Sequence, residues 1–252
     1  VSKKDSKQEE TGSDRENAET GDPVNVISGT TTFSAEDAAL IWSDSPFQFE
    51  RTYDSARAST SDFGAFGRGW RHTFESRAIF RNDAVYKGEV GDFVLLSMPD
   101  GTLIGFRDTE SGFTTTDAAG IALVKQPDGT YKLDFGDGTF WIYSATGTLT
   151  SIDDGNGNVL SLFYATGPLA EPSLTRIENT QGRFVTFTYQ SYGPFGNRMV
   201  SLQSDDPAWH VEYAYDSAGR LINTVRIASD QISRDDYRYG LYNSLMVLRQ
   251  AP

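Results

Sequence analysis

The chain has 252 residues, a formal net charge of −13 and no cysteine. The negative charge argues against nucleic acid or an anionic membrane surface as a partner, and the lack of thiols excludes disulfides and thiolate zinc sites. Hydrophobic residues make up only 38% of the chain, but aromatics reach 13% and there are 24 glycines, a mixture typical of short strands joined by tight turns. The composition therefore predicts an all-β protein.

Residues 1–22 are polar and charged and show no apolar period, so we expect a flexible leader or linker there. No signal peptide is visible at the start, and no apolar run is long enough to span a bilayer. From Pro23 onward the pattern becomes strand-like. We expect a β-rich opening domain over residues 23–140 and an array of β-hairpins over residues 141–252.

Within the opening domain, residues 24–33 predict a strand, a turn and a strand, and residues 47–53 alternate with the period of a half-buried strand. Residues 34–40 begin with the potential helix cap Ser34, so they predict a single helical turn or an irregular connection. Residues 63–70 hold three glycines and several aromatics, which indicates a loop pinned by rings. Alternation resumes from Trp70 to Phe80.

The middle of the chain predicts a series of hairpins. Asp-Gly pairs occur at Asp100, Asp128 and Asp137, each between alternating runs. Asp-Gly suits the positive φ of two-residue hairpin turns, so we expect tight turns at these three places.

A tyrosine then returns every 24–25 residues, at Tyr164, Tyr189, Tyr213 and Tyr237. Leucine and isoleucine positions keep step with it, which predicts a stack of repeats that bury their apolar faces on one another. Such a sheet would keep one face free to line a cavity. The chain ends on a strand-like run without a polar cap, so we expect it to be part of a longer array.

Sites for chemistry are weakly indicated. His72 and His210 lack metal-ligand spacing, and the segment from Asp154 to Asn158 resembles half of a calcium loop but better fits a hairpin turn. Paired acids at 153–154, 205–206 and 235–236 point to opposite faces of a strand, so we interpret them as turn or surface residues rather than a glycosidase pair. We expect no cofactor, no metal and no catalytic residue.

Two sets of residues resemble the Rhs family of YD-repeat proteins. The repeat motif consists of Tyr215, Asp216, Gly219, Arg220 and Leu221, with a degenerate copy from Tyr239 to Leu245. The opening motif consists of Gly21, Asp22, Pro23, Arg51, Tyr53, Gly69 and Trp70. The resemblance covers about residues 21–252.

The resemblance implies antiparallel β-hairpin repeats that spiral into part of a hollow Rhs shell around a toxic cargo, as in polymorphic toxins and the related Tc toxins. Implied partners are the rest of the shell, its C-terminal toxin domain and, through an N-terminal domain absent here, a VgrG-type spike. The expected location is secreted, by type VI delivery, from the bacterial cytoplasm. This sequence contains neither the PAAR-type spike domain nor the self-cleavage and toxin regions of such effectors.

Two other classes of function stay open. The tyrosines at 213, 215, 237 and 239 would also suit a stacking platform for sugars, and therefore a surface module that binds carbohydrate or a neighbouring cell. A hydrolase using Asp205 or Asp206 is the third alternative.

Overall fold

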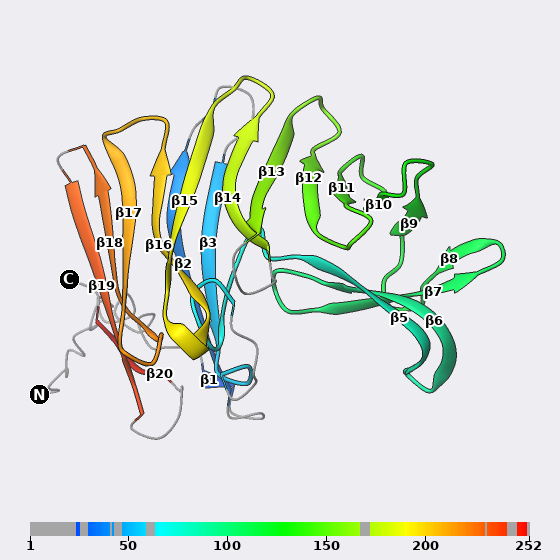
Figure 1. Cartoon of the computed structure of the whole chain (residues 1–252), viewed down its shortest axis with the longest axis horizontal. Helices are drawn as coiled ribbons and strands as arrows, with labels where there is room; N and C mark the ends of the chain where they lie inside the picture. Colours follow the sequence, from blue (N-terminus) through cyan, green and yellow to red (C-terminus); the bar gives the residue numbers. More distant parts are fainter. Residues whose placement is uncertain are drawn as a thin grey trace, which may run out of the picture.

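The computed structural model describes residues 24–25, 30–40, 42, 47–58, 64–166, 172–229, 231–240 and 246–250. The expected leader lies outside these residues, and so do Gly21, Asp22 and Pro23 of the opening motif. The described residues form antiparallel strands throughout, apart from one short 3-10 segment, η1 (Gly193–Phe195), so the all-β prediction is confirmed (Figure 1).

The first sheet, which we call the opening sheet, has four strands in chain order. Its strands are β1 (Val24–Asn25), β2 (Thr30–Leu40), β3 (Phe47–Asp54) and β4 (Trp70–His72). The helical turn expected at residues 34–40 is wrong, because these residues belong to β2. Phe33, Ala35 and Asp37 point inward in alternation, and a bulge between Glu36 and Ala38 turns Ala38 inward as well. Pairing with β3 thus overrides the helix propensity of the segment.

The second sheet, the middle sheet, also has four strands in chain order. They are β5 (Arg77–Tyr86), β6 (Glu89–Ser97), β7 (Leu103–Thr109) and β8 (Gly112–Thr114). Its β5–β6 hairpin closes through Lys87 and Gly88, both at positive φ, which is the two-residue turn geometry.

The third sheet, the repeat sheet, has twelve strands in strict chain order. They are β9 (Ala122–Lys125), β10 (Tyr131–Asp134), β11 (Phe140–Tyr143), β12 (Leu149–Asp153), β13 (Val159–Thr166), β14 (Pro172–Asn179), β15 (Phe184–Ser191), β16 (Asn197–Ser204), β17 (Trp209–Tyr215), β18 (Leu221–Ala228), β19 (Gln231–Tyr239) and β20 (Met246–Gln250). The sheet already begins at β9, and the expected division into domains at residue 140 stays a prediction.

The Asp-Gly hairpins are present, but their turns differ from the expected type. Met98 and Thr102 face each other across a three-residue loop, with the Met98 N–H donating to the Thr102 carbonyl at 2.8 Å. Of the loop residues Asp100 and Gly101, only the glycine has a positive φ. The loops at Asp128 and Asp137 likewise span three residues and end on a glycine with positive φ. Only the glycine needs the left-handed conformation in this turn, so a residue of ordinary φ precedes it.

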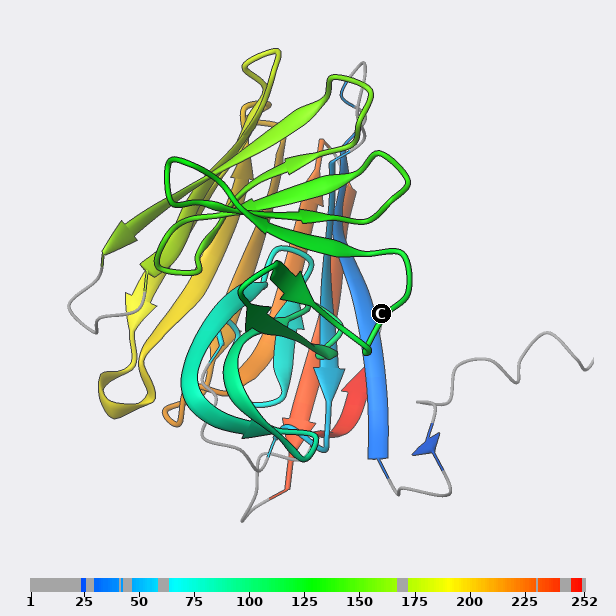
Figure 2. The ribbon, with the colours of Figure 1, turned by 90° about the vertical axis from the view of Figure 1, so that its right-hand side faces the viewer.

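The three sheets pack into two layers. Figure 2 shows the repeat sheet curving around the strands of the opening domain. Phe49 of β3 lies 5.5 Å from Phe187 of β15, and Phe66 lies 4.8 Å from Tyr213 of β17, measured between ring centroids. At the other end, Phe80 of β5 packs on Tyr131 of β10 at 4.9 Å. The apolar face of the repeat sheet is therefore covered over much of its length.

Candidate functional site

The repeat of the sequence is a hairpin with a bulge at a fixed place. The register shifts immediately before one tyrosine in each hairpin, and that tyrosine then pairs with an aliphatic residue of the next strand. These pairs are Tyr143–Leu149, Tyr164–Leu174, Tyr189–Met199, Tyr215–Leu221 and Tyr239–Met246. We call these five tyrosines the ladder tyrosines.

The ladder corrects the register inferred from the sequence. Spacing alone aligned Tyr213 and Tyr237 with Tyr189, whereas the bulges align Tyr215 and Tyr239 with it. The error arises because residues two apart in a strand point to the same face, so either tyrosine of a Tyr-x-Tyr pair preserves the apolar pattern.

Hydrogen bonds join each hairpin to the preceding one. The hydroxyls of Tyr189, Tyr215 and Tyr239 donate to the carbonyls of Leu174, Met199 and Leu221 at 2.9, 2.6 and 2.7 Å. Each acceptor is the residue paired with the previous ladder tyrosine, so the contact advances by one hairpin along the sheet. Burial raises the pKa of Tyr189 and Tyr239, which keeps these hydroxyls protonated as donors.

The rest of the repeat motif builds the turn after Tyr215. The Asp216 carboxylate accepts from the backbone N–H groups of Ala218 and Arg220 at 3.0 Å each, and the Arg220 side chain donates to it at 2.7 Å. Gly219 takes the positive φ of the loop, and Leu221 is fully buried. The repeat motif thus encodes a turn and the ladder pair that follows it, so its role is structural.

The described part of the opening motif meets the last repeats. Arg51 and Tyr53 of β3 are fully buried, and Trp70 of β4 stacks beside Tyr53 with ring centroids 5.2 Å apart. The Trp70 indole N–H donates to the Tyr239 hydroxyl at 3.0 Å. Gly69 has a φ of +81°, and a Cβ there would lie 2.7 Å from the Tyr53 ring. A hydrogen bond thus joins the opening motif to the ladder.

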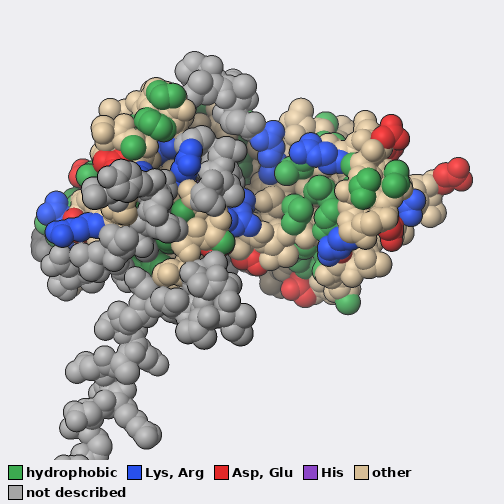
Figure 3. All heavy atoms as spheres, turned by 90° about the horizontal axis from the view of Figure 1, so that it is seen from below, with side chains coloured by type: hydrophobic (Ala, Val, Ile, Leu, Met, Phe, Trp, Pro, Cys, Tyr) green, Lys and Arg blue, Asp and Glu red, His purple; other side chains and the backbone are tan. Residues whose placement is uncertain are grey.

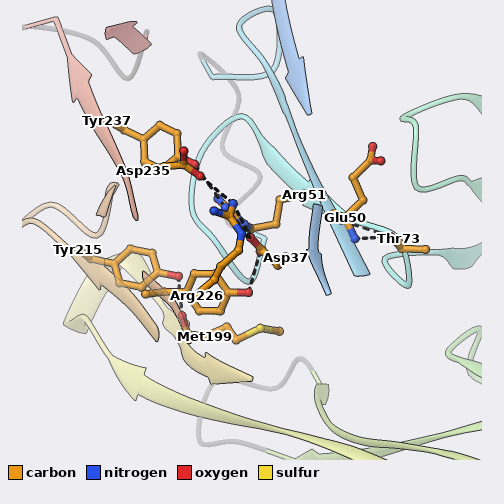
Figure 4. Close-up of polar contacts among 10 residues, drawn as sticks. Asp37, Glu50, Arg51, Thr73, Met199, Tyr215, Arg226, Asp235 and Tyr237 are labelled. Carbon is orange, nitrogen blue, oxygen red and sulfur yellow. Dashed lines mark hydrogen bonds and ion pairs between the residues drawn. The ribbon is translucent and has the colours of Figure 1, made fainter. Parts of the chain in front are cut away.

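Between the two sheets lies a buried ionic cluster (Figure 4). Asp37 of β2 forms an ion pair with Arg51 of β3, both with fully buried side chains. From the repeat sheet, Arg226 of β18 lies 3.1 Å from the Asp37 carboxylate and 2.7 Å from that of Asp235 on β19. We call these four residues the charged quartet. Its formal charges, two positive and two negative, cancel.

Two tyrosines of the repeat sheet complete the cluster. The Tyr213 hydroxyl donates to Asp37 at 2.7 Å, and Arg51 donates to the Tyr237 hydroxyl at 3.3 Å. Burial and then the Asp37 carboxylate raise the pKa of Tyr213 well above its ordinary value, so the hydroxyl stays a donor. The Arg51 guanidinium carbon also lies 5.1–5.8 Å from the ring centroids of Phe66, Trp70 and both tyrosines, which is cation–π distance.

The quartet was largely missed by sequence reasoning. Asp235 was interpreted as a turn or surface acid, but it is 2% exposed in the middle of β19, so that interpretation is wrong. Asp37 lay in the supposed helical turn, and Arg226 carried no signal. Only Arg51 was identified, through the opening motif. Asp37 and Arg226 are 189 residues apart in the chain, and nothing local in either segment indicates its partner.

The other expected sites have ordinary roles. Asp154 accepts from the backbone of Asn156 and Asn158 in a hairpin turn, as expected. His72 is buried against the Phe49 ring at 5.2 Å. Burial first, and then Arg71, lower the pKa of His72 to about 3, so the ring is neutral at physiological pH. In the part of the chain that the structure describes, no group of His, Asp and Glu could hold a metal ion, and no helix is long and apolar enough to cross a membrane.

One cavity, of about 630 Å³, opens where the opening domain and the repeat sheet diverge. Its walls come from both, with Phe74 and Glu75 on one side and Tyr164, Tyr189 and Asn197 on the other. The cavity therefore combines aromatic rings with donor and acceptor side chains.

Known proteins are similar to parts of this chain. A family model described as "Domain of unknown function (DUF6531)" matches residues 21–106, which include the described part of the opening motif. A chain of the solved structure described as "Crystal Structure of TcdB2-TccC3-Cdc42" is similar to 89% of this chain, with 15% sequence identity and a TM-score of 0.36. The match spans 14% of that chain. None of the curated proteins matches this sequence.

The chain is an antiparallel β-repeat protein. The bulged hairpins and the ladder are its repeating unit, and the family match lies in the opening region that packs against them.

Proposed function

We propose that this chain is a non-enzymatic part of a β-repeat shell of the Rhs type, which encloses a toxic cargo domain. The repeat motif and opening motif support the family, and the family-model match falls on the opening region. The curved repeat sheet supports the shell, because the same ladder bond joins three successive hairpins, through Tyr189, Tyr215 and Tyr239, to the hairpins before them.

The observation that carries the proposal is the filling of the concave side of the sheet. Aromatic residues of the opening domain pack on the inner face of β15, β17 and β19. A curved sheet plugged in this way is suited to close one end of a hollow structure, while cargo would be enclosed by further repeats. The partners of the proposal are the remaining shell, its toxin domain and a secretion spike, and the proposed destination is another cell, reached by type VI secretion.

The surface is compatible with contacts to a larger assembly. On the face shown in Figure 3, hydrophobic side chains lie next to Lys and Arg side chains over the described part, although the chain as a whole is acidic. Mixed surfaces of this kind are typical of interfaces whose rim stays polar.

The test is cryo-electron microscopy of this chain together with the polypeptide encoded next to it. We expect a curved sheet that surrounds density of another domain, and protection of that domain from added protease. A comparison variant is Trp70→Ala, which removes the ring between the opening domain and the ladder. This variant should open the closed end and so expose the enclosed domain to the protease. A compact particle without enclosed density would contradict the proposal.

A second candidate function is the binding of a small carbohydrate, favoured by the cavity beside Tyr164 and Tyr189. The tyrosine platform on residues 213, 215, 237 and 239 does not support it, because these side chains are buried or partly buried between the sheets. Aromatic rings beside Glu75 and Asn197 suit a sugar, which needs both stacking and hydrogen bonds. Titration with a panel of oligosaccharides, followed by NMR shifts of residues lining the cavity, would test it, and an absence of shifts would remove this candidate.

A further inference from the structure

The repeat sheet offers the opening domain several nearly equivalent places to dock. In each hairpin, the residues two and four positions before the ladder tyrosine lie on one face of the sheet, with their partners on the next strand. On β15, β17 and β19 this face packs against the opening domain. For β13 to β19 these two rows comprise Leu160, Leu162, Ile177, Asn179, Val185, Phe187, Leu202, Ser204, Val211, Tyr213, Thr224, Arg226, Asp235 and Tyr237. Most members are apolar, as a stack of repeats requires.

From β13 to β19, charge appears in these rows only at Arg226 and Asp235, and β20 adds Arg249 as the partner of Tyr237. The preceding repeat has Ser204 where Arg226 stands and Val211 where Asp235 stands. Those two residues would offer Asp37 neither a cation nor the second carboxylate that completes the quartet. Arg226 and Asp235 therefore distinguish this repeat from the preceding one.

We propose that the charged quartet selects the repeat on which the opening domain docks. Docking one hairpin earlier would leave Asp37 paired with Arg51 alone. Ser204 would stand in place of Arg226, and Phe187 would stand in place of the hydroxyl donor Tyr213. A single buried polar residue fixes the register of some coiled coils, because a misaligned arrangement leaves that residue without its polar partner. This inference concerns contacts within one chain, so it holds whether or not the protein encloses a cargo.

The geometry of the quartet fits a role in selection better than one in stability. Within the described residues, Nη1 of Arg51 and Oγ1 of Thr224, whose residue pairs with Asp235, are buried without a hydrogen-bond partner. A network that is incompletely satisfied is a poor substitute for an apolar core. Apolar residues of similar size in place of the quartet would accordingly preserve folding but remove the distinction between repeats.

The experiment measures where the opening domain sits. The chain has no cysteine, so Ser34→Cys on β2 and Ala165→Cys on β13, both exposed, accept a unique pair of spin labels. Docking one hairpin earlier moves β2 by two strands toward β13, or about 10 Å at a spacing of about 4.8 Å. Double electron–electron resonance then distinguishes the two arrangements.

Two variants and a control complete the design. The apolar variant combines Asp37→Leu, Arg51→Met, Arg226→Met and Asp235→Val, and we expect a folded protein with a second, shorter distance. The transferred variant combines Phe187→Tyr, Ser204→Arg, Val211→Asp, Arg226→Ser and Asp235→Val, while Tyr213 takes the place of Tyr237. We expect its main distance to shorten by about 10 Å. Glu89→Gln with Arg107→Met, which removes an exposed ion pair, should leave the distance unchanged.

Each other outcome overturns the proposal. A single unshifted distance in the apolar variant would mean that shape alone fixes the docking place. Loss of folding in that variant would make the quartet a source of stability rather than of register. An unshifted distance in the transferred variant would show that the opening domain does not follow the charges.

Discussion

Single glycines decide how closely the two motifs approach each other. Gly67, in the glycine-rich loop before Trp70, has a φ of +92°, and a Cβ there would lie 2.7 Å from the Gly219 carbonyl oxygen of the repeat motif. The backbone carbonyl of Gly219 cannot move aside as the end of a flexible side chain can, so the added Cβ would clash with it. Arg198, which is 1% exposed, fixes the same place by donating to the Gly219 carbonyl at 2.8 Å.

We expect Gly67→Ala to destabilise the protein beyond the cost of the backbone conformation alone. The matched control is Gly88→Ala, where φ is +86° and no atom lies within 4 Å of the added Cβ. A left-handed alanine costs about 1–2 kcal/mol, so the control should lose about that much. Gly67→Ala should lose at least about 1 kcal/mol more, by the range typical for strained contacts. Equal losses in urea unfolding would show that the loop and the repeat motif can separate freely.

His72 links stability to pH. Its folded pKa of about 3 lies below the ordinary value of 6.5, so below pH 6.5 the unfolded chain binds a proton that the folded chain refuses. Stability should therefore fall as the pH drops from about 6.5 toward 3, with a slope from this residue of about 1.4 kcal/mol per pH unit. His72→Gln should flatten the slope, because glutamine does not titrate. An unchanged slope in His72→Gln would contradict the burial of a neutral ring.

At the scale of elements, the ladder bonds should contribute measurably to the joining of hairpins. Tyr189→Phe leaves the buried Leu174 carbonyl without the hydroxyl that donates to it, and we expect a loss of about 1–2 kcal/mol in the free energy of unfolding. Tyr164→Phe is the control, because the Tyr164 hydroxyl has no hydrogen bond to the described residues and should be nearly neutral. The same loss at both positions would mean that ring packing, not the bond, matters.

Which elements could be predicted depends on how local their signals are. Hairpins were predictable because a glycine between alternating runs acts within a few residues. The turn type was nevertheless wrong at Asp100, Asp128 and Asp137, and the two-residue turn at Lys87 and Gly88 was missed. The strand β2 was not predictable, because Ala, Glu and Leu favour a helix locally and only pairing with β3 decides the outcome. The repeat register was ambiguous for the same reason: Tyr213 and Tyr215 share one face, and only the bulge distinguishes them.

At the scale of the whole molecule, the fold is a plugged array. The opening motif and the repeat motif were identifiable from the sequence, and the structure brings them together at Trp70 and Tyr239. The quartet that joins the sheets was not identifiable, because its members come from four strands and gain meaning only through contact. The quartet thus joins segments that lie up to 189 residues apart in the chain.

Removing one charge of the quartet should lower the free energy of unfolding more than replacing all four members with apolar residues. Asp37→Asn leaves Arg51 and Arg226 buried with less counter-charge, and breaking a buried pair in this way costs about 3–5 kcal/mol. Urea unfolding measures the loss, and Glu89→Gln, in an exposed pair, should change the free energy of unfolding by less than about 1 kcal/mol. Hydrogen exchange should locate the effect, with protection lost in β2, β3 and β18 before β14 and β15. If Asp37→Asn is as stable as the control, the quartet does not bear on how the opening domain is held, and the aromatic contacts of Phe49, Phe66 and Trp70 must hold it alone.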